Sequence, residues 1–421
     1  MSTILHREEP GRRLHRPAEE NTMAEAVPTP PRGTRPRNRR QLIMAAAAEL
    51  FARDGYAHVS MGDVADAVAV RPSALYQHFR GKDDLLYEVV NHELAAIGSA
   101  VESVGTADRR AAIRAIVAAS LDHRGTGVLW QRESRHLAPA ARDRLREQLV
   151  TTGRRYAELV GPRRPELAAP RRELITWASL AALMSISFQR IRLPRAEYEE
   201  LLAAIAEDVL DARIEPSGEE APAASTPSTG PLTSVEPLTR RDELLSAAAR
   251  LFAERGYRTV GVDDVGAAVG ITGPSVYHHF DGKLDLLVTI MLRGAEQLRH
   301  QMSRLLPLST DDAAALRGLA HSYTAYSFAN SDVMDLLIAE TAHLPDRERT
   351  AIRDVQRSYV AEWVRLLREI HGGLSDGHAR VRVQAALNVI NDTARTPSLR
   401  TQAGIVPAVC AIVRSVLRLT P

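Results

Sequence analysis

The chain has 421 residues, of which 45% are hydrophobic and 25% charged, and its formal net charge is +2. This length exceeds what a single hydrophobic core normally supports, so at least two domains are expected. The near balance of 54 basic and 52 acidic residues identifies no partner, and Cys410, the only cysteine, excludes an internal disulfide framework and a cysteine-based zinc site. Aromatic residues contribute only 5% while Ala, Leu and Arg abound, which favours an all-α fold.

The N-terminal segment, residues 1–36, is predicted to be a disordered basic arm. The string "PRGTRPRNRR" at residues 31–40 contains five arginines and no acidic residue. Such an arm can enter a DNA groove or lie along phosphates, although a solvated leader would have the same composition. The segment lacks the apolar centre of a signal peptide, and no run in the chain approaches the roughly 20 apolar residues of a membrane span. We therefore expect a cytoplasmic protein.

A domain of three short helices is predicted at residues 37–84. Apolar residues from Ile43 to Phe51 recur at helical spacing, and Gly55 ends this first helix. Ser60, with an aspartate three residues later, resembles a capping box and begins a second helix of about two turns.

The third helix is predicted in "PSALYQHF", residues 72–79. Leu75 and Phe79 lie four residues apart and should face the core, which leaves small and hydrogen-bonding residues on the outer side. Two short helices joined by a tight turn, the second with such an outer face, form the helix-turn-helix arrangement that fits the major groove of DNA.

The same pattern recurs at residues 239–285. At a constant offset of 201, Phe51 matches Phe252 and Lys82 matches Lys283. A single large offset indicates a duplicated domain, since solenoid repeats recur every ~20–50 residues. The likeness fades later in the chain, but "ESRHL" at 133–137 still matches "ETAHL" at 340–344.

The two copies differ at the turn before the third helix. Gly270 of the second copy can adopt a positive φ without strain, whereas Ala69 of the first copy is expected to be strained by ~1 kcal/mol. Thr272 is expected to act as the N-cap of the third helix, where the first copy has Arg71. The two copies are therefore similar but not equivalent.

Each copy is followed by a predicted helical body, at residues 85–213 and 286–421, and a flexible Pro-, Ser- and Thr-rich linker occupies residues 214–238. Apolar residues with a few polar anchors could line a ligand pocket in each body, although ordinary core packing is the simpler interpretation. The candidate pocket residues are Trp130, Glu133, His136, Trp177 and Met184 in the first body and Tyr323, Tyr326, Glu340, His343 and Trp363 in the second.

The strings "AAAELFARDGY" and "AAARLFAERGY", closed by "LYQHFRGKDDLL" and "VYHHFDGKLDLL", resemble the DNA-binding domain of the TetR family of bacterial transcriptional regulators. The resemblance covers about 48 residues in each copy. It implies an all-helical protein in which each unit joins three DNA-binding helices to a variable ligand-binding and dimerisation domain. It also implies operator DNA and a small molecule as partners, without a cofactor or a metal.

The resemblance further implies which residues contact DNA. Tyr76 and Tyr277 would bind phosphates through their hydroxyls, with packing against the first helix as the alternative, and Lys82 and Lys283 would bind phosphates as well. The residues expected to read base edges are Arg71, Pro72, Ser73 and Gln77 in the first copy and Thr272, Gly273, Pro274 and His278 in the second. Arg39, Arg40, Ser60, Arg240 and Arg241 complete the predicted DNA-binding set, and His78 and His279 are expected to fill the hinge between head and body.

In this family the last two helices of each unit form the dimer interface. The corresponding apolar segments here are residues 173–191 and 197–210 in the first unit, and 382–394 and 405–419 in the second. The simplest hypothesis is that the two units pair within one chain and read an asymmetric operator, as a repressor released by a hydrophobic or amphipathic effector. A ligand-independent architectural DNA-binding protein and an activator remain alternatives. An enzyme is not expected, since the usual phosphate-loop, dinucleotide, zinc-protease and hydrolase motifs are absent.

Overall fold

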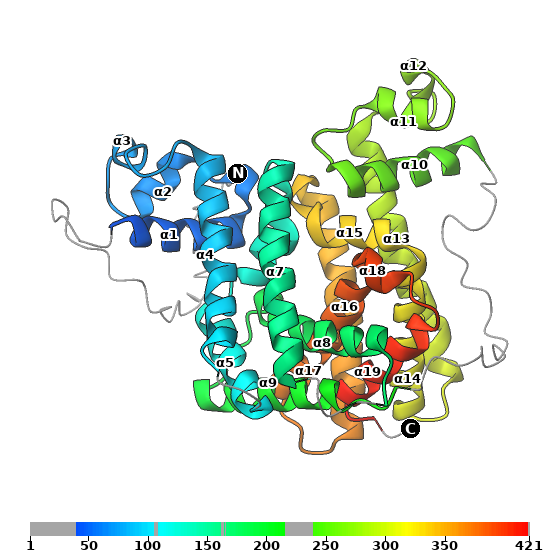
Figure 1. Ribbon diagram of the computed structural model, residues 1–421. Helices are drawn as coiled ribbons and strands as arrows, with labels where there is room; N and C mark the ends of the chain where they lie inside the picture. Colours follow the sequence, from blue (N-terminus) through cyan, green and yellow to red (C-terminus); the bar gives the residue numbers. More distant parts are fainter. Residues whose placement is uncertain (1–38, 105–107, 161–163, 165, 215–238, 420–421) are drawn as a thin grey trace, which may run out of the picture.

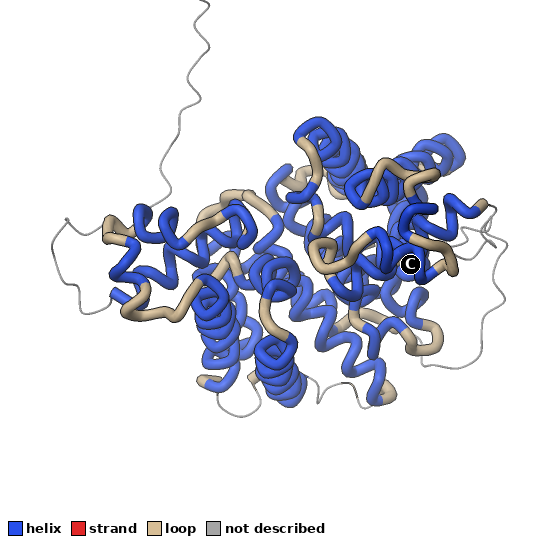
Figure 2. Tube along the Cα trace, turned by 90° about the horizontal axis from the view of Figure 1, so that it is seen from above, coloured by secondary structure: helices blue, strands red, loops and turns tan. Residues whose placement is uncertain are grey.

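The computed structural model describes residues 39–104, 108–160, 164, 166–214 and 239–419, and every regular element within these ranges is helical (Figures 1 and 2). The all-α fold predicted from composition is thus confirmed. The predicted basic arm at 1–36 and all but the first residue of the predicted linker lie outside the described residues.

The first unit consists of a small head and a larger helical body. The head comprises α1 (Arg39–Asp54), η1 (Tyr56–His58), α2 (Met61–Ala67) and α3 (Pro72–Leu75). The body comprises α4 (Lys82–Glu102), α5 (Arg109–Asp122), α6 (Thr126–Val128), η2 (Leu129–Glu133), η3 (Ser134–His136), α7 (Pro139–Val160), α8 (Ala169–Met184), η4 (Ser185–Phe188) and α9 (Arg195–Leu210).

The second unit repeats this order. Its head comprises α10 (Arg240–Arg255), α11 (Val262–Ala268) and α12 (Gly273–Val276). Its body comprises α13 (Lys283–Leu305), η5 (Leu306–Leu308), α14 (Asp312–Ala329), α15 (Ser331–Ala339), η6 (Thr341–His343), α16 (Asp346–Ile370), α17 (Asp376–Arg395), α18 (Pro397–Arg400) and α19 (Ile405–Val416).

Local signals in the sequence set where the head helices begin and end. Gly55 and Gly256 end the first helix of each head with φ of 86° and 82°, values that an L side chain rarely adopts. Ser60 and Asp63 form the predicted capping box at α2, with Ser60 N donating to Asp63 Oδ2 at 2.7 Å and Asp63 N donating to Ser60 Oγ at 3.1 Å. The short helices of the head are therefore specified largely by local chemistry.

Each head is joined to its body by one continuous helix. α4 begins in the first head and runs into the first body, and α13 does the same in the second unit (Figure 1). The domain boundaries expected at residues 84 and 285 therefore fall inside helices rather than in loops. A movement of either body is transmitted to the start of that helix without a flexible joint.

The two units pack on each other through α8 and α9 of the first unit and α17 and α19 of the second, in the lower half of Figure 1. Small buried residues such as Ala178, Ala182, Ala385 and Ala386 allow these helices to approach closely. One continuous cluster of buried apolar residues includes both bodies and the second head, whereas the first head has a separate core. The two bodies thus share one hydrophobic core, and the heads lie apart from each other.

Polar contacts also cross between the bodies. Asn388 Nδ2 donates to Ala181 O at 2.7 Å in a buried position, and Arg171 Nη2 donates to Ala403 O at 2.6 Å. Hydrogen bonds of this kind fix the register between packed helices because a shift would leave buried polar groups unpaired.

Candidate nucleic-acid interface

The outer face of α3 is the part of the first head that is most available to a partner. α3 ends at Leu75, four residues before the predicted end at Phe79, but Leu75 and Phe79 still anchor this segment to the core with exposed fractions of 0% and 1%. Five residues that the sequence predicted as DNA contacts are exposed on the other side, namely Arg71, Pro72, Ser73, Tyr76 and Gln77. These five side chains therefore lie on one accessible surface, on the side of the segment opposite to its buried residues.

The turn between α2 and α3 contains a residue in an unusual conformation. Ala69 has a φ of 54°, and the matching Gly270 of the second head has a φ of 73°. Both turns thus need a left-handed residue, which only the second head supplies as glycine. The expected strain at Ala69 agrees with this geometry.

The second head differs at the start of its third helix, α12. Gly273 is buried, and a Cβ there would lie 1.6 Å from Asp263 Oδ1. This glycine therefore offers no side-chain surface, while Thr272, Pro274, Tyr277 and His278 are exposed. Thr272 occupies the predicted N-cap position, but its Oγ1 lies 2.9 Å from Ser275 Oγ and makes no capping bond to a backbone N–H.

The two tyrosines and two lysines predicted to bind phosphates have different surroundings. The exposed fractions of Tyr76 and Tyr277 are 57% and 59%, so neither side chain is packed away against the first helix. Lys82 Nζ lies 4.1 Å from the ring centroid of Tyr56, and Lys283 Nζ lies 4.5 Å from that of Tyr257. Burial lowers the pKa of both lysines.

The arginines at the start of each head mainly stabilise the head itself. Arg40 Nη2 lies 2.9 Å from Glu88 Oε2, and its guanidinium lies over the ring of Phe79. Arg240 donates to Val269 O at 3.1 Å, and Arg241 donates to His279 O. These contacts tie the start of the first helix to the turn after the second helix and to the segment after the third.

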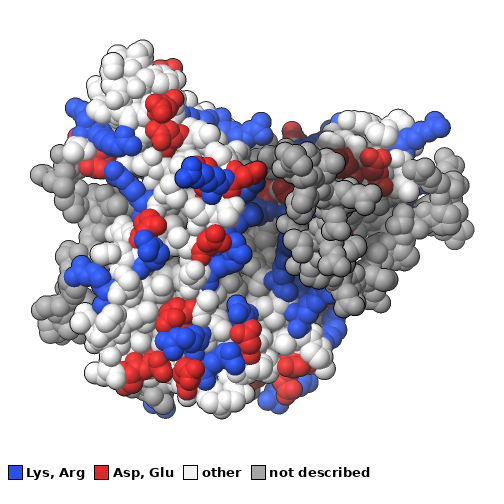
Figure 3. Space-filling model, turned by 180° about the vertical axis from the view of Figure 1, so that it is seen from behind, with Lys and Arg blue, Asp and Glu red and all other residues white. Residues whose placement is uncertain are grey.

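The charge of the two outer faces is unequal. From Met61 to Lys82 the first head has three basic and two acidic residues, whereas Val262 to Lys283 has one basic and three acidic residues. The outer end of the second head is mostly uncharged in Figure 3, at the upper left. Since DNA binding depends on neutralising phosphates, the first head has the more favourable surface.

In the first unit the hinge between head and body is filled by residues other than the expected His78, whereas His279 of the second unit is half-buried. His78 is exposed, so it does not occupy the hinge of the first unit. Instead the ring of Tyr56 stacks on His136 with centroids 5.0 Å apart, and Tyr257 contacts His343 at 5.1 Å. Burial lowers the pKa of His136.

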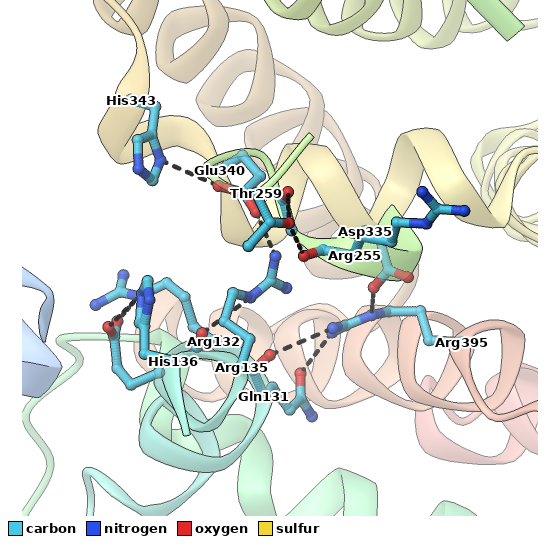
Figure 4. A network of polar contacts seen from close by, with 12 residues as sticks. Gln131, Arg132, Arg135, His136, Arg255, Thr259, Asp335, Glu340, His343 and Arg395 are labelled. Atoms are coloured by element: carbon cyan, nitrogen blue, oxygen red, sulfur yellow. Dashed lines mark hydrogen bonds and ion pairs between the residues drawn. The ribbon is translucent and has the colours of Figure 1, made fainter. Parts of the chain in front are cut away.

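Glu133 and Glu340 belong to the same two junctions. Glu133 is 2% exposed, and its Oε2 accepts a hydrogen bond from Tyr56 N at 2.8 Å. Glu340 is also 2% exposed, and its Oε2 lies 3.0 Å from His343 Nδ1 (Figure 4). Burial alone would raise the pKa of Glu340, but His343 and Arg135 outweigh it and hold that pKa below its usual range. Three of the polar anchors expected in a ligand pocket, Glu133, His136 and His343, thus contact the heads, and the recurrence of Glu-x-x-His-Leu in both copies is the sequence signal of this structural role.

The aromatic residues of the candidate pocket are part of the core. Tyr323 contacts Tyr359 and Trp363 with ring centroids 5.7 and 6.0 Å apart, and Tyr323 OH donates to Asn391 Oδ1 at 2.9 Å. In the second body Tyr326 is also buried, and in the first body Trp130, Trp177 and Met184 are partly buried against the core clusters. Trp177 packs on the backbone of α7, where a Cβ at Gly153 would lie 2.6 Å from its ring.

Within the part of the chain that the structure describes, no group of three or more His, Cys, Asp or Glu residues is arranged to hold a metal ion. None of the described helices combines the length and the apolar character needed to cross a bilayer.

Comparison with known proteins identifies both heads. The sequence model described as "Bacterial regulatory proteins, tetR family" matches residues 43–89 and 244–290. The HTH-type transcriptional repressor KstR2 of Rhodococcus jostii is 34% identical over 159 residues, which are 37% of this chain and 76% of that protein. The HTH-type transcriptional activator FasR of Mycolicibacterium smegmatis is 28% identical over 157 residues, 37% of this chain and 71% of that protein.

Solved structures are similar to this chain as well. A TetR-family transcriptional regulator from Bordetella parapertussis matches with a TM-score of 0.40 and 19% identity, over 42% of this chain and 93% of that one. The ketosteroid transcriptional regulator KstR2 of Mycobacterium tuberculosis matches with a TM-score of 0.37 and 22% identity, over 43% of this chain and 94% of that one.

Two helix-turn-helix heads on all-helical bodies define a DNA-binding transcriptional regulator rather than an enzyme. The chain belongs to the tetR family of bacterial regulatory proteins, and it carries the family's DNA-binding domain twice, as the internal repeat predicted.

Proposed function

We propose that one chain supplies both heads of a transcriptional repressor and reads two unlike half-sites of an asymmetric operator. The observation that carries this proposal is the shared core of the two bodies, closed by cross-unit contacts such as Asn388 Nδ2 to Ala181 O. The surface that family members use to pair is thereby occupied within the chain. A linker of about 25 residues also keeps the units at an effective concentration of order mM, which favours pairing in one chain.

The outer faces of the two heads support an asymmetric operator. The first presents Arg71 and Gln77, side chains that can make bidentate contacts with guanine and adenine, whereas the second presents Thr272 and His278. A symmetric dimer reads a palindrome because its two heads are identical. Unlike heads are expected to select unlike half-sites.

Operator selection from random-sequence DNA, followed by footprinting and half-site swaps, tests this reading. The selected site should contain two different half-sites, and either homopalindrome made from them should bind at least about tenfold more weakly. Light scattering should give one chain of 46.2 kDa per duplex. Equal affinity for both homopalindromes, or an obligate dimer of chains joined through α8, α9, α17 and α19, would contradict the proposal.

We further propose that a hydrophobic or amphipathic effector releases the DNA. Because Tyr323, Tyr359 and Trp363 are packed in the core of the second body, this aromatic cluster would have to open to admit such a ligand. The chain has three tryptophans, so a variant with Trp130→Phe and Trp177→Phe reports on the second body alone. Laurate, a linear fatty acid, and cholate, a fused-ring steroid acid, serve as probes because they represent two different shapes of amphipathic ligand. Saturable quenching of Trp363 together with loss of operator binding is expected, and an unchanged spectrum with both probes would count against this site.

A sequence-reading variant separates a sequence-specific regulator from an architectural DNA-binding protein. FasR, one of the similar proteins, is named an activator, so activation is kept as the alternative to repression. Arg71→Ala combined with Gln77→Ala should weaken binding to the selected operator while leaving binding to unrelated DNA nearly unchanged. Equal loss for both DNAs would favour an architectural protein.

A further inference from the structure

One buried ion pair joins the head-to-body junctions of the two units. Arg135 Nη1 of the first unit lies 2.5 Å from Glu340 Oε1 of the second, and the side chains are 16% and 2% exposed. Arg135 Nε also donates to Arg132 O at 3.0 Å, which fixes the direction of the guanidinium. Figure 4 shows this pair between the two units. Removal of Glu340 would leave the buried Arg135 guanidinium without its anionic partner, and removal of Arg135 would leave Glu340 with His343 alone.

Both ends of the pair continue to a head. On the first side the arginine belongs to the same short turn, η3, as His136, whose ring stacks on Tyr56 at the end of α1. On the second side the glutamate contacts His343, whose ring lies on Tyr257 at the end of α10. An unbroken path of contacts therefore runs from one head to the other through the ion pair.

The path ends at the two lysines predicted to bind phosphates. Lys82 Nζ lies over the ring of Tyr56, and Lys283 Nζ lies over the ring of Tyr257. Lys283 Nζ also donates to Val260 O at 2.8 Å, which ties it to its own head. The position of each lysine is thus set by the same rings that dock its head on the junction.

The sequence allows only one such pair. At the offset of 207 between the duplicated motifs, Glu133 matches Glu340, but Ala342 stands where the first unit has Arg135. The two glutamates have accordingly diverged, since Glu133 accepts the N–H of Tyr56 in its own head while Glu340 pairs with the other unit. A feature present once in a duplicated chain is specific to the pairing of these two units.

A second set of contacts holds the same region. Gln131 Nε2 donates to Asp392 Oδ1 at 3.0 Å. Arg395 Nη1 donates to Gln131 Oε1 at 3.0 Å (Figure 4). Arg395 also pairs with Asp335, and their side chains are 13% and 25% exposed. The η2–η3 segment of the first unit is thereby held between its own head and α15 and α17 of the second unit.

We propose that Arg135 and Glu340 are positioning residues that fix the distance and angle between the two heads, so that the chain accepts one spacing of half-sites. This inference rests on the proposed function, in which both heads bind one operator. One added base pair shifts a half-site by about 3.4 Å and rotates it by roughly 35°. Heads linked through a buried ion pair cannot follow such a change without breaking it.

The experiment measures affinity of the full chain, by fluorescence anisotropy, for the selected operator with zero to four base pairs inserted or removed between its half-sites. The variants are Arg135→Met, Glu340→Gln and the double variant, in which no buried charge is left unpaired. Arg357→Met, which removes an exposed pair with Asp354, is the matched control. A duplex with a single half-site reports whether each variant retains a folded head.

The wild type and the control should lose about tenfold in affinity for each base pair added or removed. The double variant keeps the shared core and the contacts of Gln131 and Arg395, so it should show a shallower loss of about threefold per base pair. Single-half-site affinity should stay within about twofold of the wild type. A double variant that keeps the sharp wild-type profile, or loses single-half-site binding as well, would overturn the positioning role alone. A wild type without any dependence on spacing would instead refute the two-headed reading itself.

Discussion

The carboxylate of Asp208, in α9 of the first unit, lies 2.8 Å from Nη1 of Arg382, in α17 of the second. The Arg382 side chain is 4% exposed and also donates to Val416 O at 2.6 Å. Burial lowers the pKa of Arg382, and its contact with Asp208 opposes that shift. The two units therefore enclose a guanidinium whose charge is compensated by the opposite unit.

Asp208→Asn is expected to reduce the free energy of unfolding by about 3 kcal/mol, because it leaves a buried guanidinium without its anionic partner. Urea denaturation followed by circular dichroism measures the change. Asp354→Asn, whose partner Arg357 is mostly exposed, serves as the control and should change stability by less than about 0.5 kcal/mol. Similar small losses in both variants would show that the pair does not hold the units together.

Ala69→Gly should stabilise the first head by about 0.5–1 kcal/mol. The gain comes from removing a left-handed alanine, at φ 54°, and is partly offset by the greater backbone freedom of glycine in the unfolded chain. Hydrogen exchange of the α2 and α3 amides measures the local opening. Gly270→Ala makes the reverse change in the second head and should destabilise it. Unchanged hydrogen exchange in both variants would mean that the turn is not strained.

The heads could be predicted from the sequence because their determinants are local. Gly55 and the Ser60 capping box mark helix boundaries within a few residues of the helices they set. The junction could not be predicted in this way, since Glu133 meets Tyr56 across 77 residues of chain and the glutamate was interpreted as a pocket anchor. Thr272 is a smaller example. Its position at the N-cap was predicted correctly, but its side chain contacts Ser275 Oγ and makes no capping bond to a backbone N–H.

For the contacts between the units, the sequence predicted only which apolar segments take part and not which residues pair. The periodic residues of 173–191 and 382–394 identified surfaces to be covered, and α8 and α17 do pack together. The ion pair of Arg135 and Glu340 left no such signal, because its partners lie 205 residues apart and occupy different places in the duplicated motif. Long-range pairing of single charges depends on the assembled fold rather than on a local pattern.

Tyr76→Phe and Tyr277→Phe should each weaken operator binding at least about tenfold, which corresponds to the loss of one hydrogen bond to a charged phosphate. The effect should be the same on selected and unrelated DNA because phosphates carry no base identity. Electrophoretic mobility shifts at fixed salt measure it. Tyr198→Phe, at a buried tyrosine of the first body, is the control and should bind normally. A loss confined to the selected operator would instead assign the tyrosines to base reading.

Asp281→Arg is expected to tighten DNA binding about tenfold at low salt, and the reverse change in the first head, Arg80→Asp, to weaken it by at least as much. Both positions are exposed and equivalent, since Arg80 N donates to Asp84 Oδ2 and Asp281 N donates to Asp285 Oδ2 just before α4 and α13. Asp281→Arg gives the second head the positive charge that the first head has beside the lysine predicted to bind phosphate. Plots of affinity against salt should steepen by about one unit for Asp281→Arg, because an added phosphate contact releases one more counterion.

Asp354→Arg makes the same charge change in the second body and should leave the slope unchanged. An equal rise in affinity for Asp281→Arg and Asp354→Arg would show that net charge alone causes the effect. The local charge of the second head would then give no reason to expect weaker DNA binding there.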